Sequence, residues 1–371
     1  MMNLHTMHRA LPLALAAGSF LVPFAGAGED DFDPPTRQEV QAGIEGGLRW
    51  LAAQQIVDGP EAGSWAGQRY RTATASFAGL AFLANGHHPG RGAYGEAAAR
   101  AMRFVQASMD SRGYLGARDN TMYVHAICSL FGLSYLGLSE DRETERELAA
   151  WCRRSVALIL EAQQVRKASA DRGGWRYTPN SRDSDLSVTS WMLLVLHAAR
   201  QCGFEVDPAV FRAALGYVNR AFVETPQGDA GFVYRPGVSR APEPGVTGVA
   251  VCVKSLLEPE ADERLRKAVA YLRSFPPAWG GEQHKGYFFF GTFYMAQGMF
   301  QLGEGEWDGF APRLQRVLLD HQHGDGHWEL PPDNKRQSHL AGTAYATALA
   351  VLILSLDKQY LPMYQRQKRL F

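Results

Sequence analysis

Cysteine is scarce in this chain, and no pair of cysteines has the spacing of a metal site. Four cysteines occur in 371 residues, at Cys128, Cys152, Cys202 and Cys252. They lie far apart, mostly in apolar helix-like sequence, which predicts small buried core residues and excludes a cysteine-rich scaffold. A disulfide between Cys152 and Cys202 is left open as an alternative.

Excess charge of one sign is also lacking. Lys and Arg together number 38, and Asp and Glu together also number 38. This balance provides no basic surface for nucleic acid or for an anionic membrane, so we expect neither as a partner. Strand-like sequence is limited to short runs such as 230–236, which predicts an all-α fold with small β pieces at one rim.

An apolar run opens the chain. It extends from Ala10 to Phe24, follows His8-Arg9, and ends before the small residues Ala25-Gly26-Ala27. The run is too short to span a membrane comfortably and has the layout of a secretory signal. We therefore expect a signal peptide at 1–27, a lead-in at 28–40, and a periplasmic or extracellular protein without a membrane span. A buried N-terminal helix is the alternative.

One sequence unit recurs six times. An amphipathic segment is followed by a Gly-rich turn with an aromatic residue, and then by a Thr-led segment of small and apolar residues. Such periods of tens of residues are typical of repeat architectures. The turn aromatics are Trp65, Tyr114, Trp175, Phe232, Trp279 and Trp328, and the threonines are Thr74, Thr121, Thr189, Thr247, Thr292 and Thr343.

The two segments of each unit predict two kinds of helix. The first has apolar residues three or four apart, as at Val156, Ile159 and Leu160, whereas a second segment such as 344–354 is apolar on all sides. A helix without a polar face must be surrounded by protein. Six hairpins of one outer and one inner helix predict a single (α/α)6 toroid over 41–356, with an open solenoid as the alternative. Residues 357–371 are expected to be a solvated or crossing tail.

The turns resemble the QW repeats of the terpenoid cyclase and protein prenyltransferase superfamily. In that motif a helix ends in Gln and a Gly-x-Trp turn begins the next helix. The matching glutamines are Gln54 or Gln55, Gln163 or Gln164, and Gln322, and we take Gln55 with Trp65, Gln164 with Trp175, and Gln322 with Trp328. We expect these residues to be structural, with the amide bonding helix ends and the indole covering the joint.

The segment 287–366 resembles exported bacterial prenyltransferase and squalene-oxidase repeat proteins. In class II terpene cyclases an Asp-x-Asp-Asp motif protonates an alkene, and Asp183-Ser184-Asp185 matches it except that Leu186 replaces the last Asp. The resemblance implies that Asp185 is the acid and Asp183 its partner. Helix capping before the segment at 187–196 is the more ordinary expectation for both.

Other chemistries of the superfamily lack residues here. A zinc site on the prenyltransferase pattern would need Asp at Ala250, two residues before Cys252, and a thioester would need Cys at Gly280. The acidic run at 30–33 lies in the lead-in and is a poor magnesium site. His321, His323 and His327 surround a turn with Asp325, where we expect a solvated loop rather than a metal site. We expect neither a metal nor a cofactor.

Aromatic residues near the starts of the inner helices predict a central apolar cavity, with filling of the barrel by these same side chains as the alternative. We therefore expect a hydrophobic small molecule, an isoprenoid or other lipid, as the partner. The alternatives are a non-catalytic scaffold that binds an envelope protein, and a carbohydrate-active protein with carboxylates such as Glu282 and Asp325. The predicted lining residues are Tyr70, Tyr123, His125, Trp191, Tyr287, Phe290, Tyr294 and Tyr345.

Overall fold

The computed structural model describes residues 32–67, 69–116, 121–258, 262–281, 287–333 and 342–365. These residues form α-helices and one short hairpin. The elements are α1 (Arg37–Gln54), α2 (Arg71–Ala84), α3 (Gly95–Gln106), α4 (Met122–Tyr135), α5 (Arg142–Gln163), α6 (Leu186–Gln201), α7 (Pro208–Arg220), β1 (Phe222–Glu224), β2 (Ala230–Phe232), α8 (Pro244–Leu257), α9 (Glu263–Arg273), α10 (Phe288–Leu302), α11 (Glu304–Leu319), α12 (Thr343–Leu354), and the 3₁₀ turns η2 (Leu356–Lys358) and η3 (Pro362–Tyr364).

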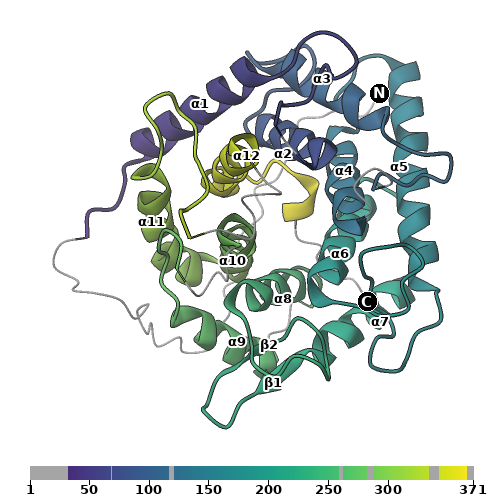
Figure 1. Ribbon diagram of the computed structural model, residues 1–371, viewed down its shortest axis with the longest axis vertical. Helices are drawn as coiled ribbons and strands as arrows, with labels where there is room; N and C mark the ends of the chain where they lie inside the picture. Colours follow the sequence, from purple (N-terminus) through teal and green to yellow (C-terminus); the bar gives the residue numbers. More distant parts are fainter. Residues whose placement is uncertain are drawn as a thin grey trace, which may run out of the picture.

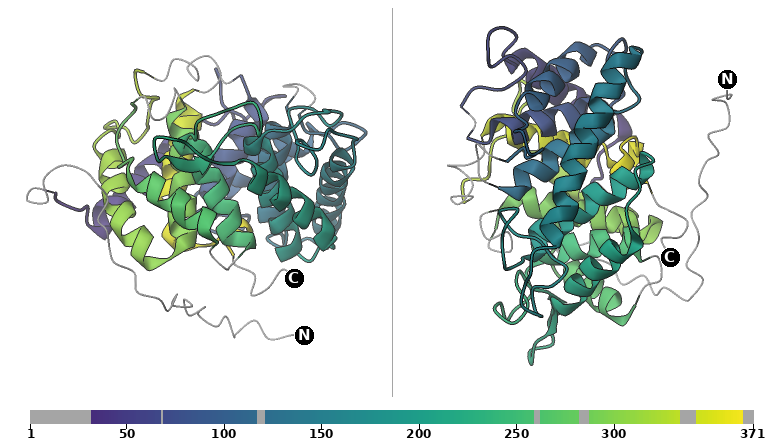
Figure 2. Two further views of the ribbon diagram at one scale, coloured as in Figure 1. Left: turned by 90° about the horizontal axis from the view of Figure 1, so that it is seen from below. Right: turned by 90° about the vertical axis from the view of Figure 1, so that its right-hand side faces the viewer.

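The helices form two concentric rings. The even-numbered helices pack side by side around the axis, and α12 returns to pack against α2, so the inner ring is closed (Figure 1). The odd-numbered helices cover this ring from outside, and the side views show the inner helices running roughly along the ring axis (Figure 2). The fold is therefore an all-α toroid, as the apolar patterning predicts.

Burial follows the two helix types expected from the sequence. Every residue of α2 after Arg71 is buried, and α6 is buried from Leu186 to Ala199. In α5, by contrast, the buried residues recur three and four apart, as at Leu148, Trp151 and Cys152. An amphipathic outer helix needs only one apolar stripe, whereas an inner helix has protein on all sides.

The tryptophans of the turns join each outer helix to the loop that follows it. The indole Nε1 of Trp65 donates to Leu51 O at 2.9 Å, that of Trp175 to Ile159 O at 2.8 Å, and that of Trp328 to Leu318 O at 2.6 Å. In each case the acceptor is a carbonyl near the C-terminus of the helix. A buried indole is thus fixed to the end of the preceding helix in all three turns.

The glutamines connect neighbouring outer helices. Gln55 Nε2 donates to Ala97 O at 2.9 Å, near the start of α3. Gln322 Nε2 donates to Gly43 O at 2.9 Å and therefore links the last outer helix to the first. Each also approaches a glycine carbonyl of its own turn, Gly63 for Gln55 and Gly326 for Gln322.

The choice of Gln164 for the middle unit is wrong in register. Gln163 is the buried glutamine, and its Nε2 donates to Gly173 O at 2.9 Å and to Val210 O at 3.1 Å. Gln164 is the exposed C-cap residue of α5. The helical phase turns position 163 toward α7 and position 164 toward solvent.

Threonines bind the turn aromatics through the backbone. The hydroxyls of Thr189, Thr247 and Thr347 accept hydrogen bonds of 3.0 Å from the backbone N–H groups of Trp175, Phe232 and Trp328, respectively. The last unit therefore uses Thr347 and not Thr343, because position 343 is the first residue of α12 and position 347 lies one turn further on.

The four cysteines are free, so the alternative of a bridge between Cys152 and Cys202 is not realised. Burial raises the pKa of the Cys202 thiol to about 11, which keeps it protonated and unreactive at neutral pH. Within the residues that the structure describes, no helix is long and apolar enough to cross a membrane.

Candidate functional site at the barrel rim

Three loops meet where the inner helices begin. Asp185 N donates to Trp175 O at 2.9 Å, and the next amide, Leu186 N, donates to Tyr234 O at 3.0 Å. Met122 N, at the start of α4, donates to Tyr177 O at 2.7 Å. The backbone therefore brings the 175–185 loop, the segment after β2 and the N-terminus of α4 to one point on the rim.

Asp185 occupies the centre of this junction. It is the N-cap of α6, and its Oδ1 accepts a hydrogen bond of 2.8 Å from Val188 N. The residue is 0% exposed, and Oδ2 has no full hydrogen-bond partner among the described residues. Burial raises the pKa of Asp185 to about 7, although the Val188 amide, Arg176 and Tyr234 all act to lower it. The capping role expected from the sequence therefore leaves one oxygen available for other chemistry.

Arg176 lies between the two predicted carboxylates. Its Nη1 is 3.3 Å from Asp183 Oδ2, and its Nε is 3.9 Å from Asp185 Oδ2. Arg235 Nη2 is also 3.3 Å from Asp183 Oδ2. The Asp183 side chain is 41% exposed and ion-paired, whereas Asp185 is buried, so the two carboxyls differ strongly in environment. Two carboxyl groups in such different environments can take different roles in acid–base chemistry.

Tyrosines complete the junction. The hydroxyls of Tyr177 and Tyr234 are 2.5 Å apart, and the Arg176 guanidinium lies over both rings, 4.8 and 5.9 Å from their centroids. Tyr123 of α4 lies 6.0 Å from Tyr177 and 6.3 Å from Phe290 of α10, measured between ring centroids. Burial raises the pKa of Tyr234, so its hydroxyl stays protonated.

Arg176, Tyr177, Tyr234 and Arg235 were not singled out from the sequence. A signal for them existed, because an Arg-Tyr pair follows Trp175 directly and a Tyr-Arg pair follows Phe232 two residues later. In both turns a Tyr stands two residues after the aromatic residue and an Arg lies directly beside that Tyr.

The predicted lining residues fall into different places. Tyr70, Tyr123, Phe290 and Tyr345 are half-buried near the N-termini of the inner helices. Tyr287 is 38% exposed on the same rim. These five are well placed to contact a molecule that binds at the rim.

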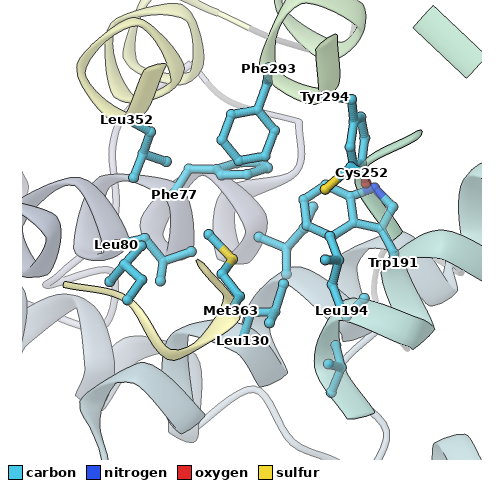
Figure 3. Packing of buried hydrophobic residues seen from close by; sticks show 14 of the residues in the cluster. Phe77, Leu80, Leu130, Trp191, Leu194, Cys252, Phe293, Tyr294, Leu352 and Met363 are labelled. Atoms are coloured by element: carbon cyan, nitrogen blue, oxygen red, sulfur yellow. The ribbon is translucent and has the colours of Figure 1, made fainter. Parts of the chain in front are cut away.

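Trp191 and Tyr294 instead belong to a packed axis. Their ring centroids lie 5.2 Å apart, and both residues are buried. Phe77 and Phe293 pack beside them, and Met363 of η3 reaches the same cluster from the far end (Figure 3). The expectation of a central cavity is therefore wrong at this depth, because side chains fill the axis.

His125 does not face the axis, and its assignment as a lining residue is wrong. Its Nδ1 accepts from Leu115 N at 3.2 Å, so its Nε2 carries the proton and donates to Ser155 O of α5 at 3.0 Å. Burial lowers the pKa of His125 to about 4, so the ring is neutral. It joins inner helix α4 to the outer ring.

The remaining candidate residues contribute little to this rim site. Glu282 and the run 30–31 lie outside the described residues. Cys252 is buried against Gln297 Oε1, at 3.7 Å, and Asp325 is paired with His327 in another loop. The acid candidates of the rim are therefore Asp183 and Asp185.

Comparison with known proteins identifies the fold but no family. No protein-family model matches the chain, and no curated protein resembles it in sequence. Several solved structures do resemble it in fold. A family 76 glycoside hydrolase from a bovine Bacteroides thetaiotaomicron strain superposes with a TM-score of 0.60 and 11% identity, over 87% of this chain and 78% of that one. The type II terpene cyclase MstE from Scytonema gives 0.55 and 13%, over 88% and 100%.

A third similar structure is the GH76A alpha-1,6-mannanase from Salegentibacter sp. HEL1_6, with a TM-score of 0.55 and 10% identity over 85% of this chain and 98% of that chain. At these identities the likeness establishes a shared toroid and no shared chemistry. The chemistry must therefore be argued from the rim.

Proposed function

We propose that this chain is an exported, terpenoid-cyclase-like toroid that binds an isoprenoid or other lipid at the rim and uses Asp185 as a proton donor. The observation that carries the proposal is the state of Asp185. It is fully buried, its pKa is raised to about 7, and one of its oxygens has no full hydrogen-bond partner among the described residues. A carboxyl that is partly protonated at neutral pH can act as an acid.

The surroundings support this use. In the proposed step the Oδ2–H bond of Asp185 breaks, a C–H bond forms on the alkene, and a carbocation remains on the substrate. Tyr123, Phe290 and Tyr177 would present π faces to that cation. Arg176 also forms an ion pair with the second carboxyl group, that of Asp183, at 3.3 Å. Loss of a proton from the cation to solvent water, and return of a proton from solvent to Asp185, would complete the cycle.

Mass spectrometry of organic extracts from the native protein tests this function. Asp185→Asn keeps the helix cap, because Asn caps as well as Asp, but removes the acidic proton. Asp141→Asn at the exposed cap of α5 is the matched control. We expect a co-purifying lipid whose identity changes only in Asp185→Asn. The same lipid in all three proteins would indicate a carrier, and no lipid in any would favour a scaffold for an envelope protein.

A second candidate is a glycoside hydrolase. It is favoured by the shared Arg176, which lies near both a partly exposed carboxyl group, Asp183, and a buried one, Asp185. Release of reducing sugar from an α-mannan by the wild type, and not by Asp185→Asn, would support this candidate over the cyclase.

Export and the repeat are parts of the same proposal. Fractionation of the cells is expected to find the protein outside the cytoplasm. N-terminal sequencing is expected to give a mature chain that begins near Gly28, where the signal would be cleaved. A mature protein that keeps its N-terminus in the cytoplasm would contradict the proposed export.

We also infer that the hairpins are copies of one QW-like unit, because the indole and amide bonds recur in them.

A further inference from the structure

A histidine-rich turn lies where the last unit meets the first. His323, His327 and Glu329 each offer a ligand atom, and these atoms all lie within 4.8 Å of one another. The two imidazole rings are stacked, with centroids 4.2 Å apart and planes inclined by 8°. We propose that these three residues bind a divalent transition metal of the zinc class, which the sequence-based expectation of a solvated loop did not include.

The backbone of the turn holds the two histidines together. His323 N donates to His327 O at 2.9 Å, and Gly326 N donates to His323 O at 2.8 Å. Gly326 has a φ of +102°, and a Cβ at this position would lie 2.4 Å from Gly46 O of α1. Only glycine fits both this conformation and this contact. The spacing of the ligands is therefore set by a turn that is pressed against the first helix.

Asp325 selects the tautomer of His327. Nδ1 of His327 donates to Asp325 Oδ1 at 2.5 Å, so in the neutral ring Nε2, 3.9 Å from Glu329 Oε1, is the nitrogen that can bind a metal. A carboxylate behind a metal-binding imidazole is the usual outer partner of a zinc ligand. Asp325 thus acts as a positioning residue, and the ligands are two imidazoles and one carboxylate.

This ligand set fits zinc. Two His and one Glu, with a fourth position left for water, is a known zinc coordination, and bond lengths of about 2.0–2.2 Å place neighbouring donors about 3.4 Å apart. His323 is exposed, and the Glu329 side chain is 63% exposed, so both can rotate by the small amount required. His327 is 16% exposed and stays fixed, with its ring 5.2 Å from that of Trp50 in α1.

The proposed metal site lies next to the contact that closes the outer ring. Gln322, the residue before His323, bonds Gly43 O of α1 and so closes the outer ring. A metal that fixes His323, His327 and Glu329 would stiffen the loop on which this contact depends. We therefore expect the metal to raise the thermal stability of the whole toroid.

Zinc titration of the full chain, without an affinity tag and after removal of metals by a chelator, tests the site. We expect one zinc ion per chain and a rise in Tm. His323→Ala should weaken zinc binding at least tenfold and abolish the Tm rise, and Asp325→Asn should weaken it about 10- to 100-fold. His321→Ala is the matched control, because His321 belongs to the same loop but stacks on Trp279 at 4.3 Å.

Two results would overturn the proposal. One is zinc binding by His323→Ala as tight as that of the wild type, and the other is an equal loss in His321→Ala, which would indicate non-specific binding by exposed imidazoles. Circular dichroism of the metal-free variants should match the wild type, since His323 is exposed. Asp185→Asn should bind zinc normally, which separates this site from the proposed rim activity.

Discussion

The two ends of the barrel are built from the same six inner helices but differ in what closes them. At the far end, η3 crosses the axis, and the carbonyl of Gln365 accepts from Gln201 Nε2 at 2.9 Å and from His197 Nε2 at 2.7 Å. Gln301 Nε2 holds the neighbouring carbonyl of Tyr364 at 3.1 Å. Burial lowers the pKa of His197 to about 4, so the side chains that donate to the η3 segment at this end are neutral.

At the rim, by contrast, charged side chains are present. Arg176 and Asp183 form an ion pair, and Asp185 keeps an oxygen without a full hydrogen bond from the described residues. Buried polar atoms without a full hydrogen-bond partner among the described residues occur at both ends, at His197 Nδ1 and Tyr364 OH as well as at Asp185 Oδ2. The two ends therefore differ in charge, since only the rim brings Arg176 and Arg235 to a carboxylate. The comparison therefore assigns stability to the η3 end and chemistry to the Asp185 end.

Truncating Met363, the η3 side chain that fills the axis, should have the largest effect on stability. Met363 is fully buried among Leu80, Leu130 and Leu194 (Figure 3). Met363→Ala leaves a cavity on the axis, and we expect it to lower the free energy of unfolding by about 2–5 kcal/mol in urea titrations. Tyr360→Ala, three residues away and 65% exposed, should change it by less than about 0.5 kcal/mol. Equal losses in the two variants would mean that the axis does not depend on η3.

The carboxyl group of Asp185 at the rim should make the stability of the protein depend on pH. Asp185 has a raised pKa of about 7 in the folded chain, against about 3.9 when unfolded. The folded state therefore binds more protons between these values, and stability falls as pH rises from about 4 to 7, by at most about 4 kcal/mol. Asp185→Asn should lack this fall and be the more stable protein at pH 8.

Thermal unfolding across this pH range measures the effect. Asp141→Asn supplies the contrast, because hydrogen bonds from Thr144 lower the pKa of Asp141, and its contribution to stability is lost on the acid side instead. A wild-type profile that runs parallel to that of Asp185→Asn would show that Asp185 is ionised throughout and is no acid.

The joints between units should give the smallest of the three effects. Gln163 is buried and serves two carbonyls, so Gln163→Ala should cost about 1–3 kcal/mol. Gln164→Ala removes an exposed side chain of the same kind and should cost less than about 0.5 kcal/mol. Urea unfolding of the two variants shows which glutamine joins the helices. A larger loss in Gln164→Ala than in Gln163→Ala would assign that role to Gln164.

The sequence predicts the toroid well because each turn is marked by residues close together in the chain. A Gln, a Gly and a Trp within one turn mark the end of an outer helix, and the apolar inner helix follows. Register is harder, since Gln163 and Gln164 both end α5, and only the helical phase decides which one is buried. The same phase turns His125 outward, although it lies two residues from Tyr123 on α4.

The rim could be predicted only in part. Asp183 and Asp185 stand out as a motif, but Arg176 and Tyr234 come from different loops and meet only in the folded chain. The filling of the axis by η3 could not be predicted. Residues 361–365 show no apolar periodicity, and their burial depends on the space that the inner helices leave. Charge pairing between distant loops and filling of an axis are tertiary properties that no short pattern records.

The bond between Gln322 and Gly43 joins residues 279 positions apart. A ring closed in this way cannot finish folding while it is being made. Until α12 exists, α1 and α2 lack a neighbour and present an apolar edge to the surroundings. Contacts of such long sequence separation form late and slowly, and exposed edges invite association with other chains. The first hairpin to be synthesised is therefore among the last to be secured, and this protein should depend on chaperones more than its length alone would suggest.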